Sequence, residues 1–425
     1  MKPLVVVSCP IETMSGYGAR ARDIVKALLK NDKYDVKVIS QRWGNTSWNA
    51  LDPNNEDDKK LLDTIWKQSH LPQQPDVWIQ ITVPNEFQPV GKFNIGITAG
   101  IETTVCDPSW IEGLNRMNLN LVSSNHAKQV FEQSTFEKRD KNTNQTVEVI
   151  KLQKPVEVLF EGVDLNKYFF IEDNDLEETE LVSQLDEIKE DFCFLYVGHW
   201  LPGVIGEDRK NTGYTIKAFL EIFKNKKNKP ALILKTSQST NCIMDRDELL
   251  KKIDAIKQTV KGDLPNVYLL HGDLEDKDMN DLYNHGKIKA MVSLTKGEGF
   301  GRPLLEFSLS KKPIIASNWS GHLDFLHPDY NILVNGTLTN VHPSSQVQNM
   351  ILAESQWFTP NDGEVADALK KVYEYYNKCL EGAKRQTHYS KTNFSFDKMA
   401  ELLDTILENN VPKQVELKLP KLKKI

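Results

Sequence analysis

Two carboxylates on either side of a glycine-rich turn form the strongest candidate for a ligand-binding or catalytic site in this sequence. Glu298 and Glu306 enclose the segment EGFGRPLLE, which follows an apolar run and leads into a helical stretch. This spacing puts Glu298 in a loop and Glu306 one turn into a helix, so both can face one ligand. Carboxylates accept hydrogen bonds from sugar or ribose hydroxyls. The alternative is a strand–turn–helix whose acids only complement the helix N-terminus.

Two further features could bind phosphate: the turn that lies between these acids, and a pair of cations upstream. Gly299 and Gly301 let the backbone approach a ligand closely, and free N–H groups at a helix start favour phosphate. Arg209 and Lys210 offer fixed cations, which stabilise the negative charge that builds on a departing phosphate. A solvated loop pair is the alternative interpretation of these two cations.

The elements that must position these residues form two α/β units. Short β-branched runs separated by helical stretches indicate parallel sheets with helices on both faces. The fold class is therefore α/β, with two Rossmann-like doubly wound domains facing a cleft, where ligands bind beyond the carboxyl ends of the strands. Predicted strands cover residues 4–7, 36–40, 77–81, 94–99, 119–123, 156–160, 192–197, 231–236, 267–270, 290–294 and 313–316, and predicted helices cover residues 17–29, 126–133, 214–223, 245–256, 277–284, 303–309, 363–384 and 396–407.

This pattern divides the chain into four parts. They are an N-terminal domain (1–185), a C-terminal domain (186–385), a helix expected to pack back on the first domain (386–412) and a basic tail (413–425). Residues 137–155 are expected to form a surface hairpin or loop, and the acidic residues 171–191 a linker with an exposed helix. Asp173 and Asp175 in that acidic run match a D-x-D metal pattern, but a solvated charged face explains it better.

Composition narrows the class of protein. The chain has 425 residues, a net charge of −6 and five scattered cysteines without metal-ligand spacing. This balance argues against a general nucleic-acid binder and predicts reduced thiols. No apolar run reaches the length of about 20 residues that a membrane span needs. The expectation is a soluble, cytoplasmic protein.

The acidic pair and several other segments resemble the retaining glycosyltransferases of family four, which have the GT-B fold. The resemblance rests on the E-x7-E pattern of residues 298–306 and covers most of the chain. The other similar segments are residues 122–131, 160–164, 197–200, 209–211, 232–236, 270–274 and 318–325. Each is weak alone, but in this order and at these separations they are specific.

The resemblance implies roles for the residues of the acidic segment. Glu306 is expected to bind the ribose of a nucleotide, and Glu298 to touch the donor sugar. The backbone of Gly299, Phe300 and Gly301 is expected to meet the diphosphate or the sugar.

The resemblance also implies that Lys210, aided by Arg209, neutralises the departing diphosphate. Many relatives carry Gly-Arg where this chain has Gly198 and His199. The missing cation could be replaced by a protonated His199 or by Arg209, Lys235 or Arg302. An inserted segment, residues 203–208, could form a mobile lid.

In the first half, Gly16 and Gly18 follow the first predicted strand and could reach the diphosphate or the acceptor, although an ordinary tight turn explains them equally well. Glu102 resembles a strand-end acid of some family members and would point into the cleft near the acceptor hydroxyl. A helix-capping or ion-paired acid is its alternative. In the resembled enzymes the departing phosphate itself is commonly proposed to take the acceptor's proton, so no single nucleophile, no metal and no cofactor are expected.

The sequence thus predicts a retaining glycosyltransferase with a nucleotide-sugar donor. A nucleotide-sugar epimerase, a phosphorylase or a non-catalytic sugar-nucleotide-binding protein could share the architecture. The acceptor stays open between a glycan, a lipid-linked sugar, a protein and a nucleic acid. Peripheral membrane contact could use Lys128, Lys138, Arg139 and Lys141.

Overall fold

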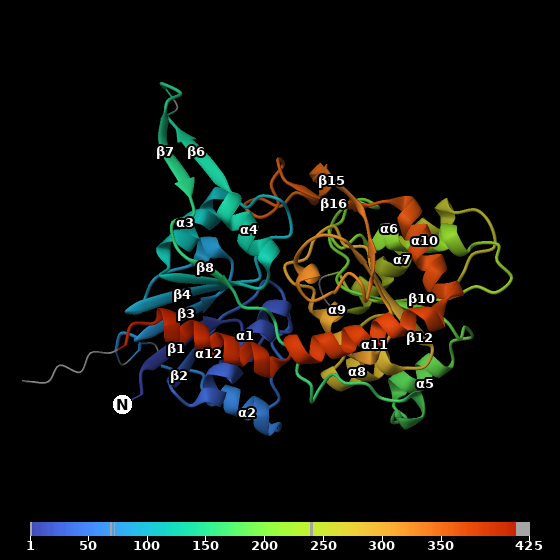
Figure 1. The fold of residues 1–425 in the computed structure, drawn as a ribbon, viewed down its shortest axis with the longest axis horizontal. Helices are drawn as coiled ribbons and strands as arrows, with labels where there is room; N and C mark the ends of the chain where they lie inside the picture. Colours follow the sequence, from blue (N-terminus) through green and yellow to red (C-terminus); the bar gives the residue numbers. More distant parts are fainter. Residues whose placement is uncertain (1, 69, 72, 141, 239–240, 414–425) are drawn as a thin grey trace, which may run out of the picture.

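Two six-stranded sheets, each parallel throughout, form the frame of the protein. The computed structural model describes residues 2–68, 70–71, 73–140, 142–238 and 241–413. The first sheet has the order β2-β1-β3-β4-β5-β8, and helices flank it in Figure 1. Its strands are β1 (Leu4–Cys9), β2 (Asp35–Ser40), β3 (Val77–Ile81), β4 (Phe93–Thr98), β5 (Leu119–Val122) and β8 (Val156–Val158), and its helices are α1 (Gly16–Asn31), α2 (Glu56–Leu62), α3 (Pro108–Arg116) and α4 (Asn125–Gln133).

The second sheet has the order β11-β10-β9-β12-β13-β14. Strand order reverses between β1 and β3 in the first sheet and between β9 and β12 in the second, and ligands of doubly wound sheets bind at such points. The strands are β9 (Cys193–Val197), β10 (Ala231–Lys235), β11 (Val267–Leu270), β12 (Ile288–Ser293), β13 (Ile314–Ser317) and β14 (Ile332–Val334), and the helices are α5 (Glu180–Asp186), α6 (Thr212–Phe223), α7 (Ile243–Thr259), α8 (Asp276–Asn284), α9 (Arg302–Phe307) and α10 (Asp362–Glu374).

Each sheet buries side chains on both faces. Along β1, Val5 and Val7 enter one core cluster while Leu4 and Val6 enter the other. Along β9, Leu195 belongs to one core cluster and Tyr196 to another, on the opposite face of the sheet. Strands buried on both faces read as continuous apolar runs, so the prediction of two doubly wound α/β domains is confirmed.

The end of the chain crosses from the second domain to the first. The predicted single helix over residues 363–384 is wrong: the chain leaves helical geometry at Tyr375 (φ −123°, ψ 35°), so α10 is followed by a separate helix, α11 (Tyr376–Asn393). A final helix, α12 (Phe396–Asn410), packs on α1 with Met399 and Leu403 in the core of the first domain (Figure 1). The predicted tail lies outside the described residues beyond Lys413.

Two short hairpins extend from the domains. Strands β6 (Thr135–Arg139) and β7 (Thr146–Lys151) form the expected surface hairpin, which projects from the first domain in Figure 1. The second hairpin, β15 (Gly336–Asn340) with β16 (Gln356–Pro360), was not predicted. It touches the first domain where the Thr104 N–H donates to the Gln356 carbonyl at 3.0 Å. None of the described helices is both long and apolar enough to cross a membrane.

Candidate functional site

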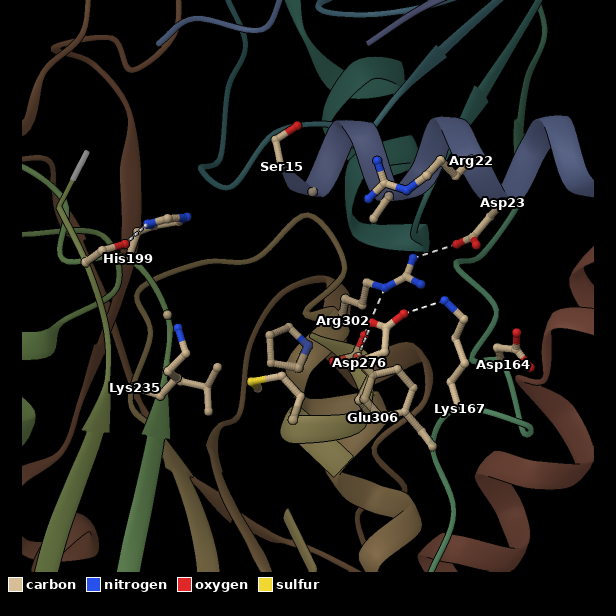
Figure 2. A pocket seen from close by; sticks show the side chains of 18 of the residues that line it. Ser15, Arg22, Asp23, Asp164, Lys167, His199, Lys235, Asp276, Arg302 and Glu306 are labelled. Carbon is tan, nitrogen blue, oxygen red and sulfur yellow. Dashed lines mark hydrogen bonds and ion pairs between the residues drawn. The ribbon is translucent and has the colours of Figure 1, made fainter. Parts of the chain in front are cut away.

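A cavity of about 420 Å³ lies between the two domains. Its walls come from the start of α1 in the first domain and from the carboxyl ends of β9 and β10 with α8 and α9 in the second (Figure 2). Five residues predicted to bind the donor and the predicted catalytic Lys210 line it; the five are Gly16, His199, Lys235, Arg302 and Glu306. The cavity therefore occupies the cleft that the two parallel sheets predict.

The glycine-rich loop before α9 fits tightly against the first domain. Gly301 has a φ of +97° at the N-cap of α9, a conformation that glycine adopts without strain. A Cβ on Gly299 would lie 2.7 Å from the Ala99 carbonyl oxygen, and one on Gly297 would lie 1.9 Å from that of Glu102. In this structure these glycines make room for the backbone of the other domain.

Glu298 lies in a compact cluster of opposite charges. Its carboxylate accepts hydrogen bonds from Lys210 Nζ at 2.6 and 2.8 Å, and Arg209 Nη1 lies 3.6 Å away. Arg209 Nη2 reaches Glu102 of the first domain at 3.5 Å. Burial would raise the pKa of Glu298, but the charges of Lys210 and Arg209 outweigh it and lower the pKa to about 2. The four predicted catalytic residues thus lie together, behind the cavity wall formed by Lys210.

Glu306 has different surroundings. Arg302 Nε donates to its Oε1 at 2.9 Å, and the Tyr283 hydroxyl lies 3.5 Å from Oε2. Burial raises the pKa of Glu306 to about 7; Arg302 opposes this shift and Asp276 adds to it. The second acid of the pair is therefore a buried hydrogen-bond acceptor that titrates near neutral pH.

The wall opposite Glu306 carries Lys235 and His199 (Figure 2). Lys235 Nζ donates to the Gly272 carbonyl at 2.6 Å, and burial lowers its pKa. The pKa of His199 is also lowered, first by burial and then by the charge of Lys210, while its Nδ1 lies 3.2 Å from Ser237 Oγ. This shift disfavours the protonated His199 that the sequence had suggested as a substitute cation.

Four of the predicted donor-binding residues do not line the cavity: Gly18, Gly299, Phe300 and Gly301. Phe300 is 3% exposed and packs against Phe325 at a ring distance of 4.9 Å. Gly18 lies inside the first turn of α1, where a Cβ would be 2.2 Å from the Thr13 carbonyl oxygen. Phe300 and Gly18 shape the walls from behind.

Several lining residues were missed from the sequence. Arg22 and Lys26 face the cavity from α1, and Arg22 Nη1 donates to the Ile11 and Thr13 carbonyls at 2.9 and 3.0 Å. Their four-residue spacing on a predicted helix was the available signal, because residues i and i+4 share a face. Asp23, Lys167 and Asp276 gave no such signal; Lys167 pairs with Asp276 at the cavity edge.

The described residues contain no group of three or more His, Cys, Asp or Glu side chains arranged to hold a metal ion. Asp173 of the D-x-D pattern accepts a hydrogen bond from the Gly286 N–H at 2.5 Å.

The inserted segment, residues 203–208, is bonded to the rest of the second domain at two points. Ser345 Oγ donates to the Glu207 carbonyl, and Ser344 Oγ accepts from the Val204 N–H at 3.3 Å.

Solved structures share this architecture at low sequence identity. No family model and no curated protein matches the chain in sequence. A glycosyltransferase from Rickettsia africae is 14% identical, with a TM-score of 0.62 over 97% of this chain and 100% of that one. Anabaena HepE in complex with UDP-glucose is 14% identical (TM-score 0.60, 96% and 100% covered), and sucrose-phosphate synthase from Thermosynechococcus elongatus is 10% identical (TM-score 0.61, 96% and 99% covered). The chain therefore has the GT-B fold of these two-domain glycosyltransferases.

Proposed function

We propose that the protein is a retaining, metal-independent glycosyltransferase that moves a sugar from a nucleotide-sugar donor to an acceptor hydroxyl. The observation that carries the proposal is the interdomain cavity, where Glu306 faces Lys235 and where Lys210 is backed by Glu298. An acid for ribose hydroxyls and cations for phosphates are thus present around one space of about 420 Å³.

The cations of the cavity favour a ligand that carries several negative charges. Among the described residues, no carboxylate pairs within 4 Å with Lys235, Lys26 or Arg22, which line the cavity from both domains. Lys210 adds a fourth cation, already held by Glu298. A nucleoside diphosphate supplies charge of this kind, and the UDP-glucose in the HepE structure of the same fold makes a UDP-sugar the first donor to test.

The proposed reaction breaks the bond between the anomeric carbon and the phosphate oxygen, and its electron pair stays on the diphosphate. The acceptor oxygen bonds to the anomeric carbon on the same face, and its proton passes to the departing phosphate oxygen. Lys210 stabilises the charge that builds on that phosphate. Glu298 contacts donor-sugar hydroxyls, and Glu102 positions the acceptor hydroxyl from the first domain. No side chain is assigned as a nucleophile.

A ligand screen followed by product analysis tests the proposal. The full chain is melted with UDP-, GDP- and ADP-glucose and with the free nucleotides, because a ligand that binds the folded state raises the melting temperature. The donor with the largest shift is then incubated with the enzyme, with and without EDTA, and the released sugar is followed by proton NMR.

Release of sugar with the donor's anomeric configuration, with and without EDTA, supports retention without a metal. An epimerised donor would instead identify an epimerase. Binding without any turnover would point to a sugar-nucleotide-binding protein, and the lack of any thermal shift would contradict the donor class.

A further inference from the structure

Arg302 joins the nucleotide side of the cavity to the first domain. Its Nε donates to Glu306 Oε1 at 2.9 Å, within α9. Its Nη1 donates to Asp23 Oδ2 on α1 at 2.6 Å and lies 3.8 Å from Glu161 Oε2, which follows β8. In Figure 2 the Arg302 guanidinium lies between Asp23 and Glu306. One side chain therefore connects acids of both domains.

The bridge is shielded from water. The exposed fractions of the side chains are 22% for Arg302, 12% for Asp23 and 10% for Glu306. Ion pairs in such surroundings are screened far less than surface pairs. Without the charge of Asp23, Arg302 would keep only Glu161 and Glu306 of these three acidic partners. The position of Arg302 is therefore sensitive to Asp23 even though Asp23 belongs to the other domain.

The orientation of Arg302 decides which oxygen of Glu306 is available. With Nη1 held by Asp23, the guanidinium meets Glu306 through Nε alone and occupies Oε1. Among the described residues, the hydrogen bond to Oε2 comes from the Tyr283 hydroxyl, at a long 3.5 Å. A guanidinium released from Asp23 could turn and take both carboxylate oxygens as a fork, a geometry that Arg favours. Oε2 would then accept from Arg302 as well as from Tyr283 and would be a poorer acceptor for a ligand.

We infer that Asp23 is a positioning residue for the nucleotide-sugar donor: through Arg302 it holds Glu306 so that Oε2, which Arg302 does not bond and Tyr283 contacts only at 3.5 Å, can accept a ribose hydroxyl. The inference rests on the proposed function, since that proposal assigns the ribose to Glu306. It adds a residue of the first domain that acts on the donor through Arg302 and Glu306.

A matched pair of variants tests this role by calorimetric titration of the full chain with UDP-glucose, or with the nucleotide sugar that gives the largest shift in the screen above. Asp23→Asn removes the charge that holds Arg302. Asp324→Asn is the control, because Asp324 Oδ2 also joins the domains by accepting from the Asn125 N–H at 2.8 Å. Within the described part of the chain, Asp324 makes no hydrogen bond or ion pair with Arg302 or Glu306. We expect the dissociation constant to rise at least tenfold in Asp23→Asn, to stay within threefold in Asp324→Asn, and to return near the wild-type value in Asp23→Glu.

The pH dependence of binding separates a positioning role from a merely structural one. Glu306 is faced by Arg302 on its own helix, by Tyr283 and Asp276 on α8, by Tyr168 and by Asp23 on α1. Burial raises its pKa to about 7, and the charge of Asp23 adds to this shift. Binding should therefore weaken as pH falls through 7, and Asp23→Asn should move this midpoint to lower pH. The diphosphate of UDP-glucose does not titrate near neutral pH, so the midpoint reports on the protein.

The outcomes distinguish the two levels of the proposal. If the wild-type protein binds no nucleotide sugar, the proposed function fails and the role of Asp23 fails with it. If the wild type binds, but Asp23→Asn and Asp324→Asn lose affinity equally or the midpoint stays in place, only the role of Asp23 is overturned. Should Asp23→Asn not fold, Arg302→Lys tests the same bridge, because Lys keeps the charge and lacks the fork.

Discussion

The surroundings of Glu298 and Glu306 differ sharply although both acids belong to one short segment. Glu298 is held by two cations, and its pKa is lowered to about 2. Glu306 shares the single cation Arg302 with Asp23 and Glu161, and its pKa is raised to about 7. Identical side chains eight positions apart can therefore serve one as a permanent countercharge and the other as a titrating acceptor.

The difference comes from which parts of the chain reach each acid. Glu298 meets the loop before α6, which carries Arg209 and Lys210. Glu306 meets α8 and, through Arg302, the first domain. Local spacing thus locates a carboxylate, whereas the surrounding elements decide its charge.

The largest expected effect tests the Glu298 cluster. Lys210→Ala should lower turnover of UDP-glucose by about 100- to 1,000-fold, the usual effect of losing one group that stabilises developing charge. Steady-state hydrolysis or transfer, measured as UDP release, gives the value. Lys217→Ala, on the exposed face of α6, is the control and should retain full activity. A change of less than threefold in Lys210→Ala would show that the cluster is structural.

The next expected effect is on the free energy of unfolding, to which the ionised forms of the two acids contribute with opposite signs. A lowered pKa means that ionised Glu298 stabilises the fold above its ordinary pKa, and that this contribution is lost as pH falls toward 2. A raised pKa means that ionised Glu306 destabilises the fold, fully so above pH 7. Each shift corresponds to on the order of 3 kcal/mol.

Thermal unfolding of Glu298→Gln and Glu306→Gln measures this contrast. At pH 8 we expect the melting temperature to fall in Glu298→Gln and to rise by a few degrees in Glu306→Gln. At pH 5 the gain in Glu306→Gln should shrink, because the folded wild type is then protonated at Glu306. Shifts of the same sign at pH 8 would contradict the assigned electrostatics.

The two acids should also differ in how much each contributes to the binding of UDP-glucose. Glu306→Ala should weaken UDP-glucose binding by about 10- to 100-fold, as expected for the loss of hydrogen bonds from a charged acceptor. Glu298→Ala should change the dissociation constant by less and mainly lower turnover. Calorimetry and kinetics on both variants give the two numbers, and equal, negligible effects in both would refute the division of roles.

The smallest effect is expected at the edge of the Glu298 cluster. Glu102 contacts Arg209 at 3.5 Å and its side chain is 27% exposed. Partly exposed ion pairs contribute little, so Glu102→Gln should reduce donor hydrolysis only about twofold to fivefold. The effect on transfer should exceed this once an acceptor is known, because Glu102 is proposed to position the acceptor hydroxyl. A greater loss in hydrolysis than in transfer would argue against that role.

Much of the fold could be predicted because its signals are local. The apolar runs at residues 77–81 and 231–236 mark strands almost to the residue, as β3 and β10 show. The seven-residue helix α2 and the three-residue strand β14 were missed, since such short elements carry too little periodicity. The break at Tyr375 was missed because the sequence around it remains helix-forming on both sides.

By itself the sequence determined two parallel-sheet domains and a strand–turn–helix that carries Glu298 and Glu306, because apolar patterning and turn chemistry act over a few residues. Only the tertiary structure decided the pKa values of those acids, and with them their charges. Arg302 and Asp23 are 279 positions apart in the chain, and their contact depends on how two separately folded sheets come together. No local pattern encodes such a contact, since charge pairing across a cleft is set by the closure of the domains and the loss of water there.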